Sequence, residues 1–594
     1  MDRNGNYFQP IALWSGRLIL PGPEERREDG GVFILMENVP ESHRSLLGKK
    51  AWLTWKASSP LARIAGRETV DMVFTAETLK SRDKGNIHPD RLNGWRRVSP
   101  LETLAGCRRN DDVQVRLKDV TAVYTAGTAL VQTGEEPVQI AGETSALVKF
   151  MEPSADLNVG YLVRHYNITT GEFDGPAEKI IIPAIPMREK PPLPAASLER
   201  LHETELNDHG WYVYGSMRNG IFTVKALEPR RLFMLKPTEY RHDAAGARQY
   251  INCDSWKDMK RGSYRIALLD SSPAQHLERK DYSSSSSLVK EGDTGLVAHL
   301  FGWIGGPGGE KPDRWGLVSG HSSFGIASVA RDIFTGDLRW YIEYKQVYAH
   351  NPEGIAAGAQ SWHCYMGGLS RGWMYLPPVS DAIILHPCLN YHYRFGTIAF
   401  TPLREIETEL FRISCVMRSG GGTGLSPVTI AESCSQNSTM ALHSLWRRLK
   451  ERCFSSVNVR RWVKKNGMAQ QAVYFKSLMS IVMGWDSYFR PFITVPPRWK
   501  RYRDMKPYRR LAGMIGVIID GLLTFRSILP RGVFDGVCGI MISRGAKIWI
   551  IRTDGIGGEM PGVIPLWPTT FHRRHPVQKA GISPEPEINN QTAG

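Results

Sequence analysis

The sequence lacks the motifs of several large protein classes. Its eight cysteines are widely spaced, with no CxxC pair and no cysteine–histidine ligand spacing, which argues against a disulfide scaffold and a structural zinc site. It contains no HExxH, no GxSxG and no glycine-rich loop ending in Lys-Ser or Lys-Thr. Zinc proteases, hydrolases with a serine nucleophile elbow and P-loop nucleotide binding are therefore not indicated. We expect a protein of a reducing, cytoplasmic compartment that uses no cofactor and no metal.

Long apolar runs are also missing. A membrane-spanning helix needs about 20 apolar residues, and the nearest run here, LAGMIGVIIDGLL at 511–523, is shorter and contains Asp520. It follows the basic stretch PPRWKRYRDMKPYRR. A basic segment followed by an apolar one is typical of proteins that lie on anionic membranes. Such peripheral binding would use four cations, namely Arg498, Lys500, Arg501 and Arg503; a core helix behind a solvated basic face is the alternative.

Length and charge limit the architecture and the partners. At 594 residues the chain is too long for a single hydrophobic core. Its 75 Lys and Arg exceed its 59 Asp and Glu, which gives a net charge of +16. This excess favours anionic partners such as lipid headgroups or acidic polymers, but no motif indicates specific nucleic-acid binding.

Short strand-like segments separated by Gly, Pro, Asn and Asp fill the first half of the chain, as in sandwiches or barrels. The segment GWYVYGSMRNGIFTVKALEPRRLFML predicts a hairpin that turns at Arg218-Asn219-Gly220. Composition changes then divide the chain. We predict N-terminal β-modules over 1–182, a Pro-rich linker over 183–197, a β-module over 198–285, a candidate catalytic domain over 286–450, a basic C-terminal region over 451–580 and a disordered tail over 581–594.

The strongest chemical candidate is Cys434. It follows a glycine-rich loop, GGGTGLSP, and stands where a helix is predicted to start, with Ser433 or Ser435 as its cap. Unpaired amides and the partial positive charge of a helix N-terminus lower the pKa of a thiol and can bind an oxyanion. We therefore predict Cys434 as a nucleophile, against the alternative of a small buried thiol.

A cysteine nucleophile needs a base, and His321 is the candidate. It opens the strand-like segment HSSFGIASVA, which a turn at Thr335-Gly336 links to LRWYIEYKQVYAHN. Folding the two as a hairpin brings His321 near the end of the second strand. We predict His350 as the group that orients the base, with Gln346 and Glu343 on the same strand as alternatives. A metal site of His299, His321 and His363, and a carboxylate site that includes Asp381, are weaker alternatives.

The order H-x-x-x-G-I-x-x-V, a hairpin ending in Y-A-H, and then S-C at a helix start resembles the permuted papain-like group, which includes lecithin:retinol acyltransferase-like enzymes. The resemblance covers about 150 residues. It implies His321 as base, His350 as orienting group and Cys434 as nucleophile. The predicted fold is then multidomain: mostly β in the first half, an α+β permuted papain-like core, and a mixed helical, basic C-terminal region.

A second resemblance runs through nearly all of the chain. Segments such as GNIHPDRLNGW, VRHYNITTGEFDGPAE, QVYAHNPEGI and GAKIWIIRTDGIGG resemble a mainly cyanobacterial family labelled "predicted Abi (CAAX) protease". That label implies a membrane-associated protease with a Glu-Glu-x-x-x-Arg motif and metal-binding His and Asn in spanning helices. Here PEERRED has Asp29 in place of the arginine, and HPCLN, from His386 to Asn390, lies in a strand-like, proline-containing segment.

The leading hypothesis is a thiol-dependent hydrolase or acyltransferase that acts on a peptide, amide or acyl substrate through an acyl-enzyme. The rival is a non-enzymatic scaffold of β-modules whose basic surface docks on an anionic membrane or polymer. The CAAX-type protease of the family label is the third. Enhanced reactivity of Cys434 relative to the other cysteines separates the first hypothesis from the rival.

Overall fold

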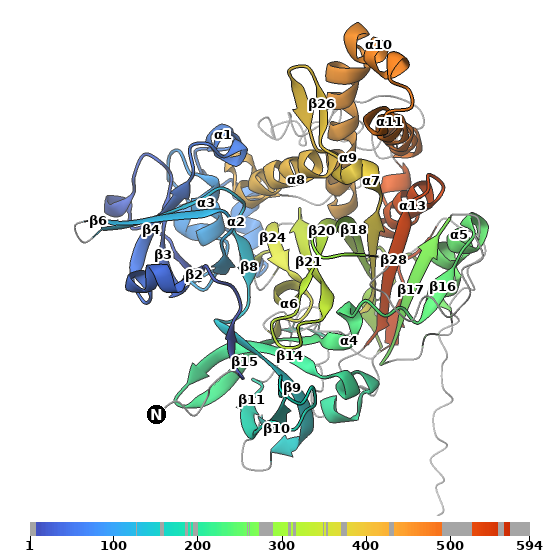
Figure 1. The fold of residues 1–594 in the computed structure, drawn as a ribbon. Coiled ribbons are helices and arrows are strands. Elements are labelled where there is room, and N and C mark those ends of the chain that lie inside the picture. The colour runs from blue at the N-terminus through green and yellow to red at the C-terminus, as the bar shows by residue number, and fades with distance from the viewer. Residues whose placement is uncertain are drawn as a thin grey trace, which may run out of the picture.

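The structure of the chain is a computed structural model. It describes residues 7–125, 128–154, 160–183, 188–189, 192–193, 200–257, 259, 262–271, 289–306, 311–312, 316–347, 350–351, 354–369, 377–426, 433–489, 525–555 and 564–570. The fold is mixed α/β, with one very large sheet, a smaller sheet and helices packed on them (Figure 1).

The large sheet has 15 strands and runs through most of the molecule. Its first eight strands, in spatial order, are β16 (Glu239–Arg241), β17 (Ser263–Asp270), β28 (Lys547–Asp554), β25 (Pro378–Leu385), β18 (Thr294–Phe301), β20 (His321–Arg331), β21 (Leu338–Gln346) and β24 (Gly358–Ser361). The remaining seven are β8 (Val138–Ile140), β5 (Gln114–Arg116), β2 (Ser15–Ile19), β3 (Val32–Asn38), β4 (Lys50–Trp55), β7 (Thr128–Thr133) and β6 (Val120–Thr125). Neighbours are antiparallel except β16–β17, β24–β8 and β4–β7.

The smaller sheet closes on itself. It consists of β9 (Thr144–Ser154), β10 (Gly160–His165), β11 (Ala177–Ile181), β15 (Ile221–Pro229) and β14 (Trp211–Arg218), and β14 pairs back with β9. A short strand, β1 (Gln9–Pro10), is added to β9. Inside this barrel Phe150, Trp211 and Phe222 are buried. The hairpin predicted between β14 and β15 is confirmed: Asn219 and Gly220 both have positive φ, as a tight two-residue turn requires.

Pairing between distant segments departs from the predicted division of the chain. Strands on both sides of the Pro-rich segment 183–197 close the same barrel, so this segment does not separate two β-modules. Likewise β28, from the C-terminal block, pairs with β25 of the predicted catalytic block on one side and with β17, from the block 198–285, on the other. Each of these strands gains hydrogen bonds and buries apolar side chains across the sheet, which local composition does not reveal.

The middle of the large sheet is covered on both faces. One face packs against α8 (Pro402–Ser419), α9 (Cys434–Leu449) and α13 (Pro530–Ile542), and α11 (Gln470–Phe489) packs on α9 and α13; the barrel lies on the opposite side of the sheet (Figure 1). Side chains along β18 alternate accordingly. Ala298 and Leu300 join the helical core, whereas Val297 and Phe301 join the core on the barrel side.

The other described elements are short. The helices are α1 (Pro60–Arg67), α2 (Ala76–Asp83), α3 (Pro100–Ala105), α4 (Arg230–Phe233), α5 (Ala244–Asn252), α6 (Trp362–Tyr365), α7 (Pro387–Asn390) and α10 (Val457–Lys465). Four two-stranded ribbons pair β12 (Arg188–Glu189) with β13 (Pro192–Leu193), β19 (Trp303–Gly305) with β29 (Ile564–Leu566), β22 (His350–Asn351) with β23 (Gly354–Ile355), and β26 (Tyr393–Phe395) with β27 (Ile398–Phe400).

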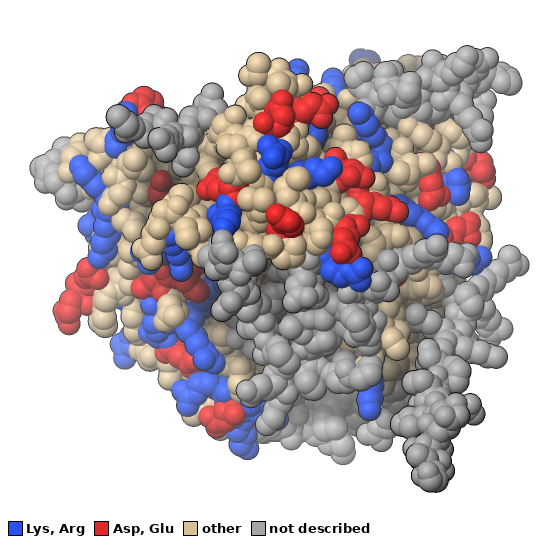
Figure 2. Space-filling model, turned by 90° about the horizontal axis from the view of Figure 1, so that it is seen from below, with Lys and Arg blue, Asp and Glu red and all other residues tan. Residues whose placement is uncertain are grey.

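Two sequence predictions concern the surface. Among the described residues, no helix is both long and apolar enough to cross a bilayer. The proposed membrane-binding cations Arg498, Lys500, Arg501 and Arg503, the apolar run 511–523 and the tail 581–594 lie outside the described residues. On the face shown in Figure 2, described Lys and Arg side chains lie among Asp and Glu side chains.

Candidate active site

Cys434 is the first residue of α9, as the sequence predicts. Ser433 is the N-cap, and its side-chain oxygen accepts a hydrogen bond of 3.3 Å from the backbone amide of Gln436. The first turn is held further by Ser435, whose hydroxyl donates to the carbonyl of Ile528 over 3.2 Å. This places the thiol at the positive end of a 16-residue helix dipole.

The hairpin predicted around His321 is also present. β20 starts at His321 and pairs antiparallel with β21, and Gly336 takes a positive φ of 70° in the connection. Helix α9 packs directly against β20. The start of the helix and the start of the strand therefore meet, and this brings together two residues that lie more than a hundred positions apart in the sequence.

The environment of Cys434 favours the thiolate. Burial by itself would raise the pKa of the thiol, but the charge of His321 and a hydrogen bond with its side chain act in the opposite direction. The backbone amides of Ser322 and Ser435 also hydrogen-bond to the sulfur. The result is a pKa below the ordinary value of a cysteine.

The other cysteines differ from Cys434 in both exposure and acidity. Cys434 is partly exposed, whereas the remaining seven are buried. Burial raises the pKa of the thiol at five of those buried positions: to about 12 at Cys388 and Cys415, to about 11 at Cys453, and above the ordinary value at Cys107 and Cys538. A lowered thiol pKa is therefore a property of this site and does not reflect a general effect of the protein interior.

The orienting partner of His321 is Gln346, one of the two predicted alternatives. His321 Nε2 lies 2.9 Å from Gln346 Oε1, and Gln346 Nε2 donates to the Ser323 hydroxyl over 3.1 Å. Because the amide nitrogen of Gln346 is a donor to Ser323, its oxygen is the acceptor and His321 Nε2 carries the hydrogen. His321 Nδ1 is then the ring nitrogen left to accept a proton.

Glu343, the other predicted alternative, is not part of this site. Side chains alternate along β21, so Glu343 points to the opposite face of the sheet from Gln346. There it forms ion pairs with Arg116 and Lys118. Burial would raise the pKa of this carboxyl, but Arg116, Lys118 and Lys345 lower it to about 2. Glu343 is thus a structural anion that joins β21 to the N-terminal strands.

His350, the first choice from the sequence, is described only by its backbone. It lies in the ribbon β22–β23, where it pairs with Ile355. Its side chain is outside the described residues. The described orienting contact of His321 is therefore the amide of Gln346, which lies four residues before His350.

A second polar cluster lies beside His321 on the same face of the sheet. His299 Nδ1 is 2.6 Å from Asp381 Oδ1, and the hydroxyl of Tyr344 donates to Asp381 Oδ2 over 2.8 Å. The rings of His299 and His321 are 6.5 Å apart. His299 Nε2 is buried and has no hydrogen-bond partner among the residues that the structure describes. Phe301 and Tyr365 pack against both imidazoles.

The alternative sites expected from the sequence are not assembled. His363 stacks on Tyr214, with ring centroids 3.9 Å apart, and hydrogen-bonds to Ser361. His386 caps α7 and contacts the carbonyl of Arg544. Within the described part of the chain, no group of three or more His, Cys, Asp or Glu residues is arranged to hold a metal ion.

Sequence reasoning missed two contributors to the site and the role of a third residue, Asp381. Ser322 supplies an amide to the sulfur, Ser323 fixes the amide of Gln346, and Asp381 pairs with His299. The two serines follow His321 directly, so the polar run HSS was a usable signal. Asp381 was expected only in a carboxylate site, because its contact with His299 depends on the pairing of β25 with β18.

The chain was compared with protein families, curated proteins and solved structures. No family model, no curated protein and no solved structure matches the chain.

Proposed function

We propose that the protein is a thiol-dependent hydrolase or acyltransferase of the amidase and peptidase class, with Cys434 as nucleophile and His321 as its base. One observation carries the proposal: the single partly exposed cysteine begins a helix, hydrogen-bonds to a histidine and has a lowered pKa. Reactive cysteines occupy such environments, whereas structural cysteines are buried and inert.

In the proposed reaction the Cys434 thiolate attacks the carbonyl carbon of an amide or ester. The carbon–sulfur bond forms, the carbon–nitrogen or carbon–oxygen bond breaks, and protonated His321 gives its proton to the leaving group. A water or a second nucleophile then attacks the thioester, with His321 taking its proton. The products are a free acid or a transferred acyl group and the regenerated thiol.

The surroundings of the sulfur suit these steps. The amides of Ser322 and Ser435 donate to the sulfur in the resting state, so they lie close to where negative charge develops on the acyl oxygen. Gln346 holds the ring of His321 and fixes the hydrogen on Nε2. The order histidine, glutamine, cysteine along the chain agrees with the permuted papain-like arrangement, which we propose as the relationship of this core.

The first test measures thiol reactivity. The full-length protein is treated with limiting iodoacetamide at neutral pH, and alkylation of each of the eight cysteines is followed by mass spectrometry. Cys434 should react well before the others and at a lower pH than a free cysteine. Equal reactivity of Cys434 and the buried cysteines would contradict the proposal.

The second test concerns turnover. A panel of peptide, amide and thioester acyl donors is screened for formation of an acyl adduct on Cys434, both with and without an amine acceptor. Cys434→Ala should abolish adduct and product while leaving the circular dichroism spectrum unchanged, and Cys388→Ala provides the matched control. Product formation that survives in Cys434→Ala would end the assignment. Acid or amide as product separates hydrolysis from acyl transfer.

A further inference from the structure

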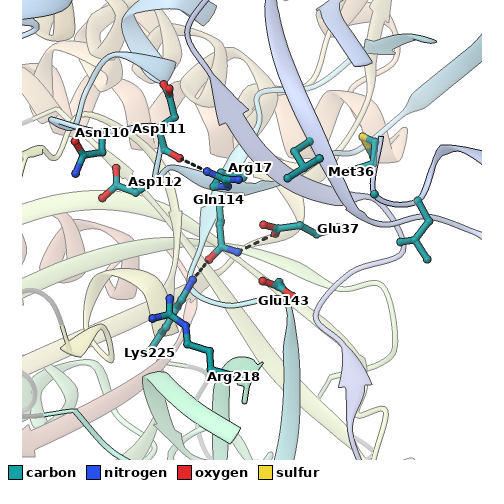
Figure 3. A pocket seen from close by; sticks show the side chains of 13 residues that line it. Arg17, Met36, Glu37, Asn110, Asp111, Asp112, Gln114, Glu143, Arg218 and Lys225 are labelled. Carbon is teal, nitrogen blue, oxygen red and sulfur yellow. Dashed lines mark hydrogen bonds between the residues drawn. The ribbon is translucent and has the colours of Figure 1, made fainter. Parts of the chain in front are cut away.

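A cavity of about 820 Å³ lies between the N-terminal part of the large sheet and the barrel, apart from Cys434. Its walls come from β2, β3 and β5 on one side and from the hairpin β14–β15 on the other (Figure 3). None of its lining residues takes part in the thiol site. The volume lies in the range of pockets that hold small molecules.

Seven charged side chains of both signs line this cavity, and two of them, Asp111 and Asp112, form ion pairs with Arg91 and Arg108. Lys225 of β15, Arg218 at the end of β14 and Arg17 of β2 supply the positive charges, and Glu37 of β3 and Glu143, which follows β8, supply negative ones. In Figure 3 Lys225 and Arg218 lie on one side and the two glutamates on the other. Among the described residues, none of the other five charged side chains forms a salt bridge.

Gln114 keeps the two signs apart. Its amide nitrogen donates to Glu37 over 2.8 Å, while its oxygen accepts from Lys225 over 2.9 Å and from the backbone amide of Gly142 over 2.9 Å. The side chain is buried, and its three contacts fix its orientation. Lys225 and Glu37 therefore remain on opposite sides of a neutral spacer, and each keeps hydrogen-bonding capacity for another partner.

The surroundings disfavour the charged forms of Glu37 and Lys225, the residues at the two ends of the cavity. Burial, together with the nearby charge of Glu143, raises the pKa of Glu37 to about 7, although Gln114, Lys225 and Arg17 act against this shift. Burial and the charges of Arg218 and Arg17 lower the pKa of Lys225, although Glu37 and Glu143 act against this shift. A ligand with charges of the opposite sign at each end would offset both penalties.

We propose that this cavity binds a zwitterion of the size of a short peptide, with the ammonium group between Glu37 and Glu143 and the carboxylate at Lys225 and Arg218. Charge-assisted hydrogen bonds to both termini would give affinity. A ligand with a single charge would leave the opposite end of the cavity desolvated and unpaired, which gives specificity for the zwitterion. The site is independent of the thiol chemistry and holds whether or not Cys434 is a nucleophile.

The test is calorimetric titration of the full-length Cys434→Ala protein with trialanine, so that hydrolysis cannot consume the probe. Trialanine with free termini should bind, and acetylation of its amine or amidation of its carboxylate should each weaken binding by at least about tenfold, the effect of losing one charged contact. Equal binding of free and blocked peptides, or no binding of free trialanine at millimolar concentration, would overturn the proposal.

Two variants test which terminus of the peptide binds at each end of the cavity. Glu37→Gln should weaken binding of free trialanine but not of the acetylated peptide, which has no ammonium group. Lys225→Met should weaken binding of free trialanine but not of the amidated peptide, which has no carboxylate. Neutralisation of exposed charges elsewhere, Glu24→Gln and Lys80→Met, provides the matched controls. Loss of binding in a control, or retention in both cavity variants, would contradict the assignment of these ends.

The pH dependence gives a readout that a purely structural role would not change. Glu37 faces Gln114, Glu143, Lys225 and Arg17 and has a pKa of about 7. Below that pH it is neutral and no longer attracts the ammonium, so affinity for free trialanine should fall as the pH drops from about 8 to about 6. Glu37→Gln should remove this dependence; a pH profile identical in wild type and variant would count against the site.

Discussion

Two buried imidazoles on neighbouring antiparallel strands differ in the side chain that forms a hydrogen bond with each of them. His321 begins β20 and is held by the neutral amide of Gln346, whereas His299 lies inside β18 and is held by the carboxylate of Asp381. Their rings are 6.5 Å apart and share the contacts of Phe301 and Tyr365. One ring, with an amide as its partner, lowers the pKa of a neighbouring thiol, and the other has a carboxylate as its partner.

The physical reason lies in charge. An amide orients an imidazole without neutralising it, so a proton on His321 acts in full on the neighbouring sulfur. A carboxylate would compensate part of that charge and weaken its effect on the thiol. Asp381 stands in this position beside His299, and the hydroxyl of Tyr344 donates to its second carboxylate oxygen. Position matters as well, because the end of β20 meets the start of α9 while the middle of β18 does not.

The largest expected effect comes from breaking the contact between His299 and Asp381. Asp381→Asn removes the charge that both His299 and Tyr344 bond to, and should reduce the free energy of unfolding by about 3 kcal/mol, as for other buried charge-assisted contacts. Thermal and urea unfolding measure the loss, with exposed Asp83→Asn as control. The alkylation rate of Cys434 should stay within error of the wild type. A fall in that rate without loss of stability would contradict the contrast between the two histidines.

The reverse pattern is expected for the ring that acts on the thiol. In His321→Ala the sulfur loses both the charge and the hydrogen bond that lower its pKa, so alkylation of Cys434 near neutral pH should slow by about tenfold or more. The pH at which the thiol becomes reactive should move upward, toward that of an ordinary cysteine. At high pH the wild type and the variant should converge, because both thiols are then ionised. The exposed His392→Ala is the control.

A result that leaves the pH profile of Cys434 alkylation unchanged in His321→Ala would assign the low pKa to the helix N-terminus and the backbone amides that contact the sulfur. The amides of Ser322 and Ser435 would then carry the effect.

Local features of this molecule could be predicted from the sequence. The start of α9 at Cys434, the Ser433 cap and the two hairpins depend on short-range signals, namely a capping serine and turn glycines. The meeting of His321 with Cys434 followed from a hairpin plus a helix start. The orienting group was assigned less well, because Gln346, Glu343 and His350 lie on one segment and only the register with β20 selects among them.

Long-range pairing could not be predicted. Asp381 reaches His299 because β25 lies beside β18, and β28 lies beside β25 although it comes from near the end of the chain. The barrel similarly joins strands from both sides of a proline-rich segment. Such pairings depend on burial across whole sheets, whereas composition reports only on neighbours in sequence. The charged cavity has the same origin, since its walls come from two sheets.

The smallest effect, and the most specific one, is expected at Gln346. Gln346→Ala removes one orienting hydrogen bond, worth about 1 kcal/mol, and should slow alkylation of Cys434 by about fivefold. Gln346→Glu keeps the shape but gives His321 the kind of partner that His299 has. The added carboxylate stabilises the protonated ring, and by compensating the charge of that ring it should raise the pKa of Cys434. The rise of the alkylation rate with pH should therefore shift to higher pH in the glutamate variant, and it should not shift in a variant that only loosens packing. If the profile of Gln346→Glu matches that of Gln346→Ala, the neutrality of the amide has no role, and the contrast between the two imidazoles reduces to their position in the sheet.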